Sequence, residues 1–122
     1  MQVSKQKLNK TIERQIYNIL HQLIGDIKTP KEAEVLFEDL LSVTERQVVA
    51  KRLAIAIFLD KGRSYENIKN TLKVSSATIA SVQEQMGNPG TQLALQKVKA
   101  EEWAGEWAGK ITNLMGKIIP SK

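Results

Sequence analysis

The chain has 122 residues, which is the size of a single domain. Apolar residues make up 42% and charged residues 25%, a composition that is typical of a globular protein with a core. Cysteine is absent and histidine occurs once, at His21, which excludes disulfides, thiolate chemistry and any site that needs two histidines.

The net charge of +5 is spread along the chain and is not gathered in a tail. Residues 1–28 carry +3, residues 29–60 carry −2, and residues 61–86 and 87–122 carry +2 each. A basic balance is compatible with nucleic acid or another anionic surface. The longest apolar run, from Leu53 to Leu59, has seven residues, which is too short to span a membrane. No secretory signal is visible, so we expect a cytoplasmic protein without integral membrane association.

Helical periodicity along most of the sequence predicts an all-α chain. The first helix is expected from Ser4 to Ile27, with Ser4 as a candidate cap and with apolar residues on one face. This apolar stripe consists of Leu8, Ile12, Ile16, Ile19, Leu20, Leu23 and Ile27. A second helix is expected to open at Thr29-Pro30, because Thr suits the N-cap and Pro suits the first helical position.

The third helix is expected to start at Ser42 or Thr44 and to run to Gly62. Its second half is apolar on all sides, which predicts a central position in the fold. Two short helices follow, over residues 64–72 and 75–86, with Ser64 as the first cap and either Ser75 or Ser76 as the second. Two short helices joined by a few residues match the helix-turn-helix outline. The apolar seam between them is expected to consist of Ile68, Leu72, Val74, Ile79 and Val82.

The last predicted element is an amphipathic helix over residues 91–119, after a breaker over residues 87–90. Trp103 and Trp107 lie on its apolar stripe, and the tetrapeptide Glu-Trp-Ala-Gly occurs twice in it. Three interpretations remain open: the helix packs on its own or a second copy of the chain, it binds another protein through the two Trp residues, or it lies on a membrane surface.

Three pieces of the central sequence carry a resemblance to a known family. They are LLSVTERQVVAKRLAIA, LDKGRSYENI and VSSATIASV, all within residues 40–86. In these pieces the chain resembles the Trp repressor superfamily, and most closely the small Trp-repressor-like bacterial proteins of the YerC/YecD type. The resemblance implies an intertwined all-α homodimer, with residues 1–87 as the family domain and a helix-turn-helix at 64–86 in each protomer.

The resemblance also implies a double-stranded DNA interface. A recognition helix enters the major groove with its N-terminal residues on base edges, and small side chains there allow close approach. Basic side chains nearby contact phosphates, and Lys51 and Arg52 in the third helix are further candidates for this role. The DNA-binding residues are expected to be Arg63, Lys69, Lys73, Ser75, Ser76, Ala77, Thr78, Ala80 and Ser81.

The sequence departs from the family pattern in three respects. No Lys or Arg occurs from Val74 to Gln96, which predicts weak DNA binding with a shallow salt dependence. Lys73 stands where many such turns have glycine. In the Trp repressor two arginines hold tryptophan; Arg52 matches the first, but Ser81 occupies the position of the second. Arg52 and Ser81 therefore define only a weak effector pocket, and we expect no tryptophan binding and no other cofactor.

The sequence shows no sign of an enzyme. Adjacent carboxylates, as in Glu38-Asp39, point apart on a helix, and there is no glycine-rich phosphate loop or metal-ligand spacing. The first hypothesis is a homodimeric, sequence-specific DNA-binding transcriptional regulator of the repressor type. The alternative is a helical dimer that serves as a protein-interaction module with little DNA binding.

Overall fold

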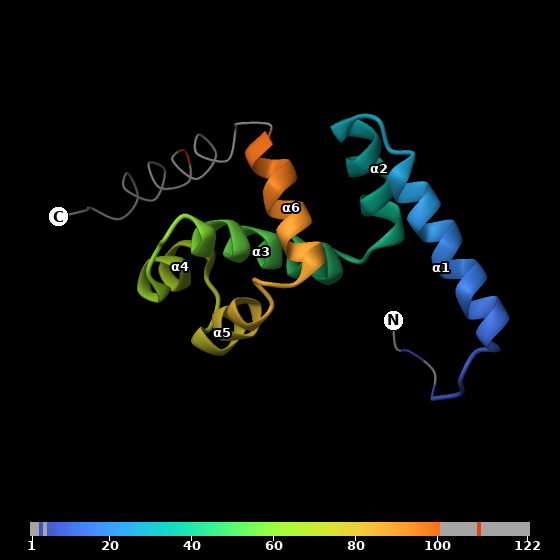
Figure 1. Cartoon of the computed structure of the whole chain (residues 1–122), viewed down its shortest axis with the longest axis horizontal. Helices are drawn as coiled ribbons and strands as arrows, with labels where there is room; N and C mark the ends of the chain where they lie inside the picture. The colour runs from blue at the N-terminus through green and yellow to red at the C-terminus, as the bar shows by residue number, and fades with distance from the viewer. Residues whose placement is uncertain (1–2, 4, 101–109, 111–122) are drawn as a thin grey trace. The chain divides into compact units, whose positions relative to one another are not determined.

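The computed structural model describes residues 3, 5–100 and 110, and this part of the chain contains helices and no strands (Figure 1). The prediction of an all-α chain is therefore confirmed. The described residues form α1 (Lys10–Gly25), α2 (Pro30–Leu40), α3 (Val43–Asp60), α4 (Tyr65–Leu72), α5 (Ser76–Glu84) and α6 (Pro89–Ala100). The chain divides after Val43 into two compact units, the first with α1 and α2 and the second with α3 to α6.

Side-chain caps set the starts of α1 and α2. The Asn9 carboxamide oxygen accepts hydrogen bonds from the amides of Thr11 (2.8 Å) and Ile12 (3.4 Å), so α1 begins at Lys10. The predicted start at Ser4 was wrong, because Asn9 supplies the cap: its side chain satisfies the amides of Thr11 and Ile12, and its carbonyl accepts the first helical hydrogen bond from Glu13. The predicted opening of α2 is confirmed: the Thr29 hydroxyl accepts from the Glu32 amide at 3.1 Å, with proline as the first helical residue.

Neither α1 nor α2 contains a buried residue. Most of the apolar stripe that the sequence predicted for the first helix is exposed to solvent within the single chain. Leu8, Ile12, Ile16, Ile19 and Leu20 are between 43% and 68% accessible, whereas Leu23 and Ile27 are partly buried. The first unit therefore has an amphipathic surface but no core of its own.

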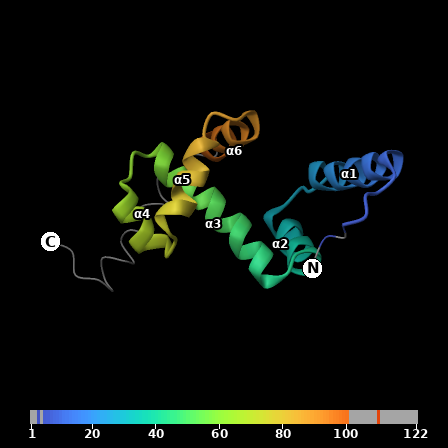
Figure 2. The same ribbon diagram turned by 90° about the horizontal axis from the view of Figure 1, so that it is seen from below.

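The second unit is organised around α3, as its sequence predicted. Five consecutive residues, Ala54 to Phe58, are buried, so this stretch of the helix is covered on every side. Ile68 of α4, Ile79 and Val82 of α5, and Leu95 of α6 join them in one core cluster. Figures 1 and 2 both show α4, α5 and α6 gathered around α3.

A glycine ends α3 where the sequence predicts it. Gly62 has a φ of 77°, and its amide donates to the Leu59 carbonyl at 3.0 Å. The Arg63 amide donates to the Phe58 carbonyl, also at 3.0 Å, which completes a Schellman motif. This motif turns the chain sharply and directs it into α4.

The last described helix, α6, begins earlier than expected. Pro89 and Gly90 were assigned to the breaker, yet they form the first turn of α6, because proline is pre-organised for the first helical position. Lys99 of α6 forms a 3.0 Å ion pair with Asp60 at the end of α3. The expected continuation to residue 119, including Trp103 and Trp107, lies outside the described residues except for residue 110.

Candidate functional site

The site is built on α4 and α5, which are joined by residues 73–75. The predicted apolar seam holds the two helices: Ile68 and Ile79 are fully buried, and Val82 is 6% exposed. Leu72 and Val74 pack against the same cluster and are partly buried. Because the seam continues into the core formed by α3, both helices are packed against α3.

The turn between the helices has an unusual backbone conformation at Lys73. This residue has a φ of 56° and a ψ of 55°, which is the left-handed region that favours glycine. Its amide still caps α4 by donating to the Lys69 carbonyl at 2.9 Å. The sequence-based expectation that Lys73 occupies a glycine-type position is therefore confirmed.

Ser75 is the cap of α5. Its hydroxyl oxygen accepts from the Thr78 amide at 3.1 Å and lies 2.9 Å from the Thr78 hydroxyl oxygen. Of the two capping residues that the sequence allowed, the structure therefore selects Ser75, and Ser76 is the first residue of the helix. The two hydroxyls form a small polar network at the N-terminal end of α5.

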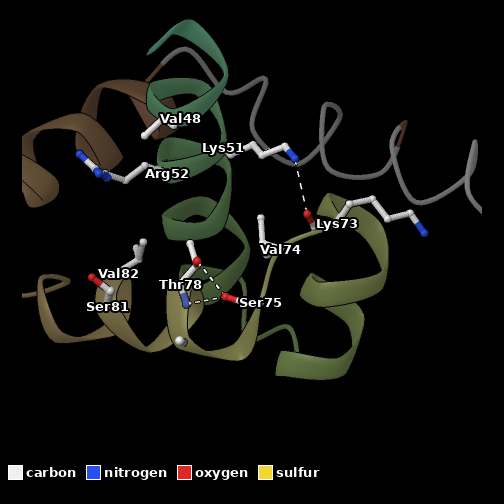
Figure 3. A pocket seen from close by; sticks show the side chains of 10 residues that line it. Val48, Lys51, Arg52, Lys73, Val74, Ser75, Thr78, Ser81 and Val82 are labelled. Atoms are coloured by element: carbon white, nitrogen blue, oxygen red, sulfur yellow. Dashed lines mark hydrogen bonds between the residues drawn. The ribbon is translucent and has the colours of Figure 1, made fainter. Parts of the chain in front are cut away.

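An open hollow of about 610 Å³ lies between α3 and the beginning of α5 (Figure 3). Three cationic side chains line it: Lys51 and Arg52 from α3, and Lys73 from the turn. Three hydroxyl-bearing residues line it as well: Ser75, Thr78 and Ser81. Its apolar lining consists of Val48, Val74, Ala77 and Val82, and none of its lining residues is acidic.

The structure brings together most, but not all, of the residues expected at a DNA interface. The hollow gathers Lys73, Ser75, Ala77, Thr78 and Ser81 from the expected set. Arg52 and Ser81, the two residues assigned to a weak effector pocket, also line it. Arg63, Lys69, Ser76 and Ala80 are not among its lining residues.

The four remaining residues have different surroundings. The Arg63 guanidinium carbon lies 5.5 Å from the centre of the Phe58 ring, a distance at which a cation is attracted to the face of an aromatic side chain. Lys69 is half-buried near the end of α4. Ser76 is exposed at the start of α5, whereas Ala80 is half-buried and faces solvent less than its place in the sequence suggested.

Lys51 makes the contact that the sequence could not predict. Its ammonium group donates to the Lys73 carbonyl at 3.5 Å and so joins α3 to the turn before α5 (Figure 3). The two residues are 22 positions apart, and no periodicity or motif connects them. The sequence indicated Lys51 as a further candidate for phosphate contact, but not its contact with the turn.

The whole net charge of the chain resides in residues 44–100, which contain α3 to α6. This stretch has nine Lys and Arg residues against four Asp and Glu residues, whereas residues 1–43 have six of each and residues 101–122 have three of each. An excess of +5 beside a hollow without carboxylates favours an anionic partner.

The side chains that line the hollow are of types that suit an anion. Lysine and arginine donors together with hydroxyls suit the oxygens of phosphate groups. In the described part of the chain, no group of three or more His, Asp or Glu side chains is arranged to hold a metal ion. None of the helices described has both the length and the hydropathy needed to cross a lipid bilayer.

Two comparisons with known proteins give matches to this chain. The family model described as Trp repressor protein matches residues 15–99, which include all of α2 to α5 and nearly all of α6. The chain is also 35% identical over 88 residues to the uncharacterized protein YerC of Bacillus subtilis (strain 168). This alignment covers 68% of the present chain and 85% of that protein. No solved structure gives a significant match.

Proposed function

The chain belongs to the Trp repressor family, and we propose from this premise that it is a sequence-specific, DNA-binding transcriptional regulator that acts as a homodimer. The α4–α5 pair would serve as the helix-turn-helix, with α5 as the recognition helix in the major groove. Two such helices would read half-sites about one helical turn apart, roughly 34–36 Å, a spacing taken from helix-turn-helix dimers in general, the Trp repressor among them.

The observation that carries this proposal is the surface at the start of α5. Ser76, Ala77, Thr78 and Ser81 are all exposed, and their short side chains allow close approach of the helix to base edges. The methyl groups of Ala77 and Thr78 suit contact with a thymine methyl, and the hydroxyls suit hydrogen bonds to bases or phosphates. Lys73 adds a cation at the edge of this surface.

The exposed apolar surface of the first unit supports the homodimer. Full burial of one Leu or Ile side chain contributes about 1.5–3 kcal/mol. The five half-exposed side chains of this stripe therefore leave about 5 kcal/mol per protomer available to an association, before the entropy cost of binding. A second copy of the chain presents the same stripe, so a two-fold symmetric contact is self-complementary.

The dimer is tested by the mass of the protein in solution. We expect light scattering to give about twice the 13.7 kDa of the chain. Ile16→Glu, in the centre of the stripe, should reduce the molecular mass in solution or the helix content. The substitution places a charge in the apolar contact that we propose between the two copies of the chain. His21→Glu is the matched control, since His21 is exposed and lies outside the stripe. A wild-type mass of 13.7 kDa at micromolar concentration would contradict the dimer.

DNA binding is tested by fluorescence anisotropy against random genomic fragments, followed by sequencing of those retained. We expect enrichment of a palindromic site. Thr78→Asp should abolish binding with the fold intact, because a carboxylate in the first turn of α5 repels phosphates while it suits the helix N-terminus. Lys69→Glu should also abolish binding, and Lys97→Glu on α6 is its matched control for charge.

Two results would contradict the proposal. Retained binding in both Thr78→Asp and Lys69→Glu would show that the DNA-binding residues are wrongly assigned. If the wild-type protein fails to bind any fragment even at low salt, the hypothesis of a DNA-binding regulator is refuted. The alternative hypothesis, a protein-interaction module, is then favoured.

A further inference from the structure

We propose that the hollow between α3 and the start of α5 binds a phosphate group, and that Lys51 of α3 is a phosphate ligand in it. The inference rests on the proposed function for the source of the phosphate, which is the DNA backbone. A free phosphorylated compound offers the same chemistry, and the experiment below separates the two sources.

The hollow has a positively charged lining. Lys51, Arg52 and Lys73 line it without any carboxylate, so the lining has a formal charge of +3. Two of these cations belong to α3, outside the α4–α5 pair. A cationic, concave surface of this kind attracts an anion more strongly than scattered lysines on a convex surface do.

Lys51 is positioned to donate hydrogen bonds to a phosphate in the hollow. Its ammonium group reaches the Lys73 carbonyl at 3.5 Å, which draws it over the turn and toward the hollow (Figure 3). This single long hydrogen bond uses one of its three donors, so two remain for a ligand. Lys51 is exposed, and a ligand can therefore approach it from solvent.

The hydroxyls of Ser75 and Thr78 offer a further hydrogen-bond donor to a phosphate. They lie 2.9 Å apart, and either one can donate to the other. Whichever donates, the second hydroxyl keeps its hydrogen and can offer it to a phosphate oxygen. The Ser75 oxygen also accepts from the Thr78 amide, which fixes this pair at the rim of the hollow.

This arrangement accounts for a recognition helix without bases. No Lys or Arg occurs from Val74 to Gln96, so α5 itself supplies no cation for the DNA backbone. Lys51, presented by α3 across the hollow, places a positive charge next to the N-terminal end of α5. The cation that many recognition helices carry themselves would then come from the supporting helix.

Lys51→Gln tests the proposal, with Lys97→Gln as the matched control. Both substitutions remove one charge from the second unit, but Lys97 lies on α6 and does not line the hollow. Affinity for a duplex carrying the enriched site is measured from 50 to 300 mM salt. Because affinity varies with salt to the power of about −0.9 per phosphate contact, each lost contact should cost roughly 8-fold at 0.1 M salt. The slope should become shallower by about 0.9 for each protomer.

The outcomes separate this proposal from the proposed function. If the wild-type protein binds DNA and Lys51→Gln loses no more affinity and no more slope than Lys97→Gln, the phosphate site is refuted and the regulator stands. If the wild-type protein does not bind DNA, the proposed regulator function is refuted. A titration with inorganic phosphate then tests whether the hollow binds phosphate. Shifts of the Ser75 and Thr78 amide resonances with phosphate that disappear in Lys51→Gln would then support a site for a free phosphorylated compound, and no shifts would refute it.

Discussion

Lys73 is the residue at which a single substitution tests both the turn and the interface. Its φ of 56° places a lysine in a region that glycine adopts without penalty. Lys73→Gly relieves this strain and keeps the capping hydrogen bond from the residue 73 amide to Lys69. It also removes one cation from the hollow. We therefore predict that Lys73→Gly makes the fold more stable and DNA binding weaker.

The size of the stability gain follows from two opposing effects. A non-glycine residue in the left-handed region costs about 1–2 kcal/mol. Glycine avoids this cost in the folded state, but it makes the unfolded chain more flexible, which lowers the free energy of unfolding by about 0.4–1 kcal/mol. The net gain in the free energy of unfolding is about 0.5–1 kcal/mol. For a chain of 122 residues, with an unfolding entropy of about 2.1 cal/mol/K per residue, this corresponds to about 2–4 °C in Tm.

Thermal unfolding followed by circular dichroism measures the gain, at one fixed protein concentration because a dimer's Tm depends on concentration. Lys73→Ala is the control, since it removes the same charge and leaves a Cβ in the strained position. We expect Lys73→Gly to melt above both Lys73→Ala and the wild type. If Lys73→Gly and Lys73→Ala melt at the same temperature, the reasoning about the turn is refuted.

Two further predictions concern the packing and the cap of the α4–α5 pair. Ile68→Ala should lower the free energy of unfolding by about 2–5 kcal/mol in urea denaturation, because Ile68 is fully buried and its loss leaves a cavity; a loss below 1 kcal/mol would contradict the seam. Ser75→Ala should cost about 1 kcal/mol, because the Thr78 amide loses its capping partner; Ser76→Ala is the neighbouring control and should cost less, and equal losses would mean that Ser75 is not the cap.

Much of the second unit could be predicted from the sequence because its signals are local. Gly62 ends α3, Ser64 caps α4, and the turn follows from the spacing of two short apolar patterns. The central place of α3 was visible because Leu53 to Leu59 is apolar on every side. In each case the residues that determine the structure lie within one or two helical turns of one another.

The boundaries that were missed show where local signals compete. Ser4 and Asn9 are both good caps, and the pattern of α1 could not choose between them. At the other end, Pro89 and Gly90 are typical of a loop, but they also fit the first turn of a helix, and α6 starts there. Such choices depend on which backbone amides find partners in the folded chain.

The candidate DNA-binding surface was predicted in part. The small exposed residues of α5, the positive φ at Lys73 and the basic residues Lys51 and Arg52 of α3 were expected from the sequence. The hydrogen bond from Lys51 to the Lys73 carbonyl was not, because it joins α3 to the turn before α5 only in the packed unit. A contact across 22 residues depends on the tertiary structure and leaves no periodicity to detect.

The most direct test of the central claim is the salt dependence of binding between the wild-type protein and the duplex site enriched from genomic fragments. The proposed function assigns phosphate contacts to Arg63, Lys69 and Lys73, which would make six contacts in a homodimer. We predict that the logarithm of the binding constant falls linearly with the logarithm of salt concentration, with a slope of about −5, or about −7 if Lys51 also contributes; both are shallower than the slope of about −9 that ten phosphate contacts would give. A scrambled duplex of the same length should bind more weakly at every salt concentration. Equal binding to both duplexes would contradict sequence-specific recognition, and no binding at 50 mM salt would contradict a DNA-binding function altogether.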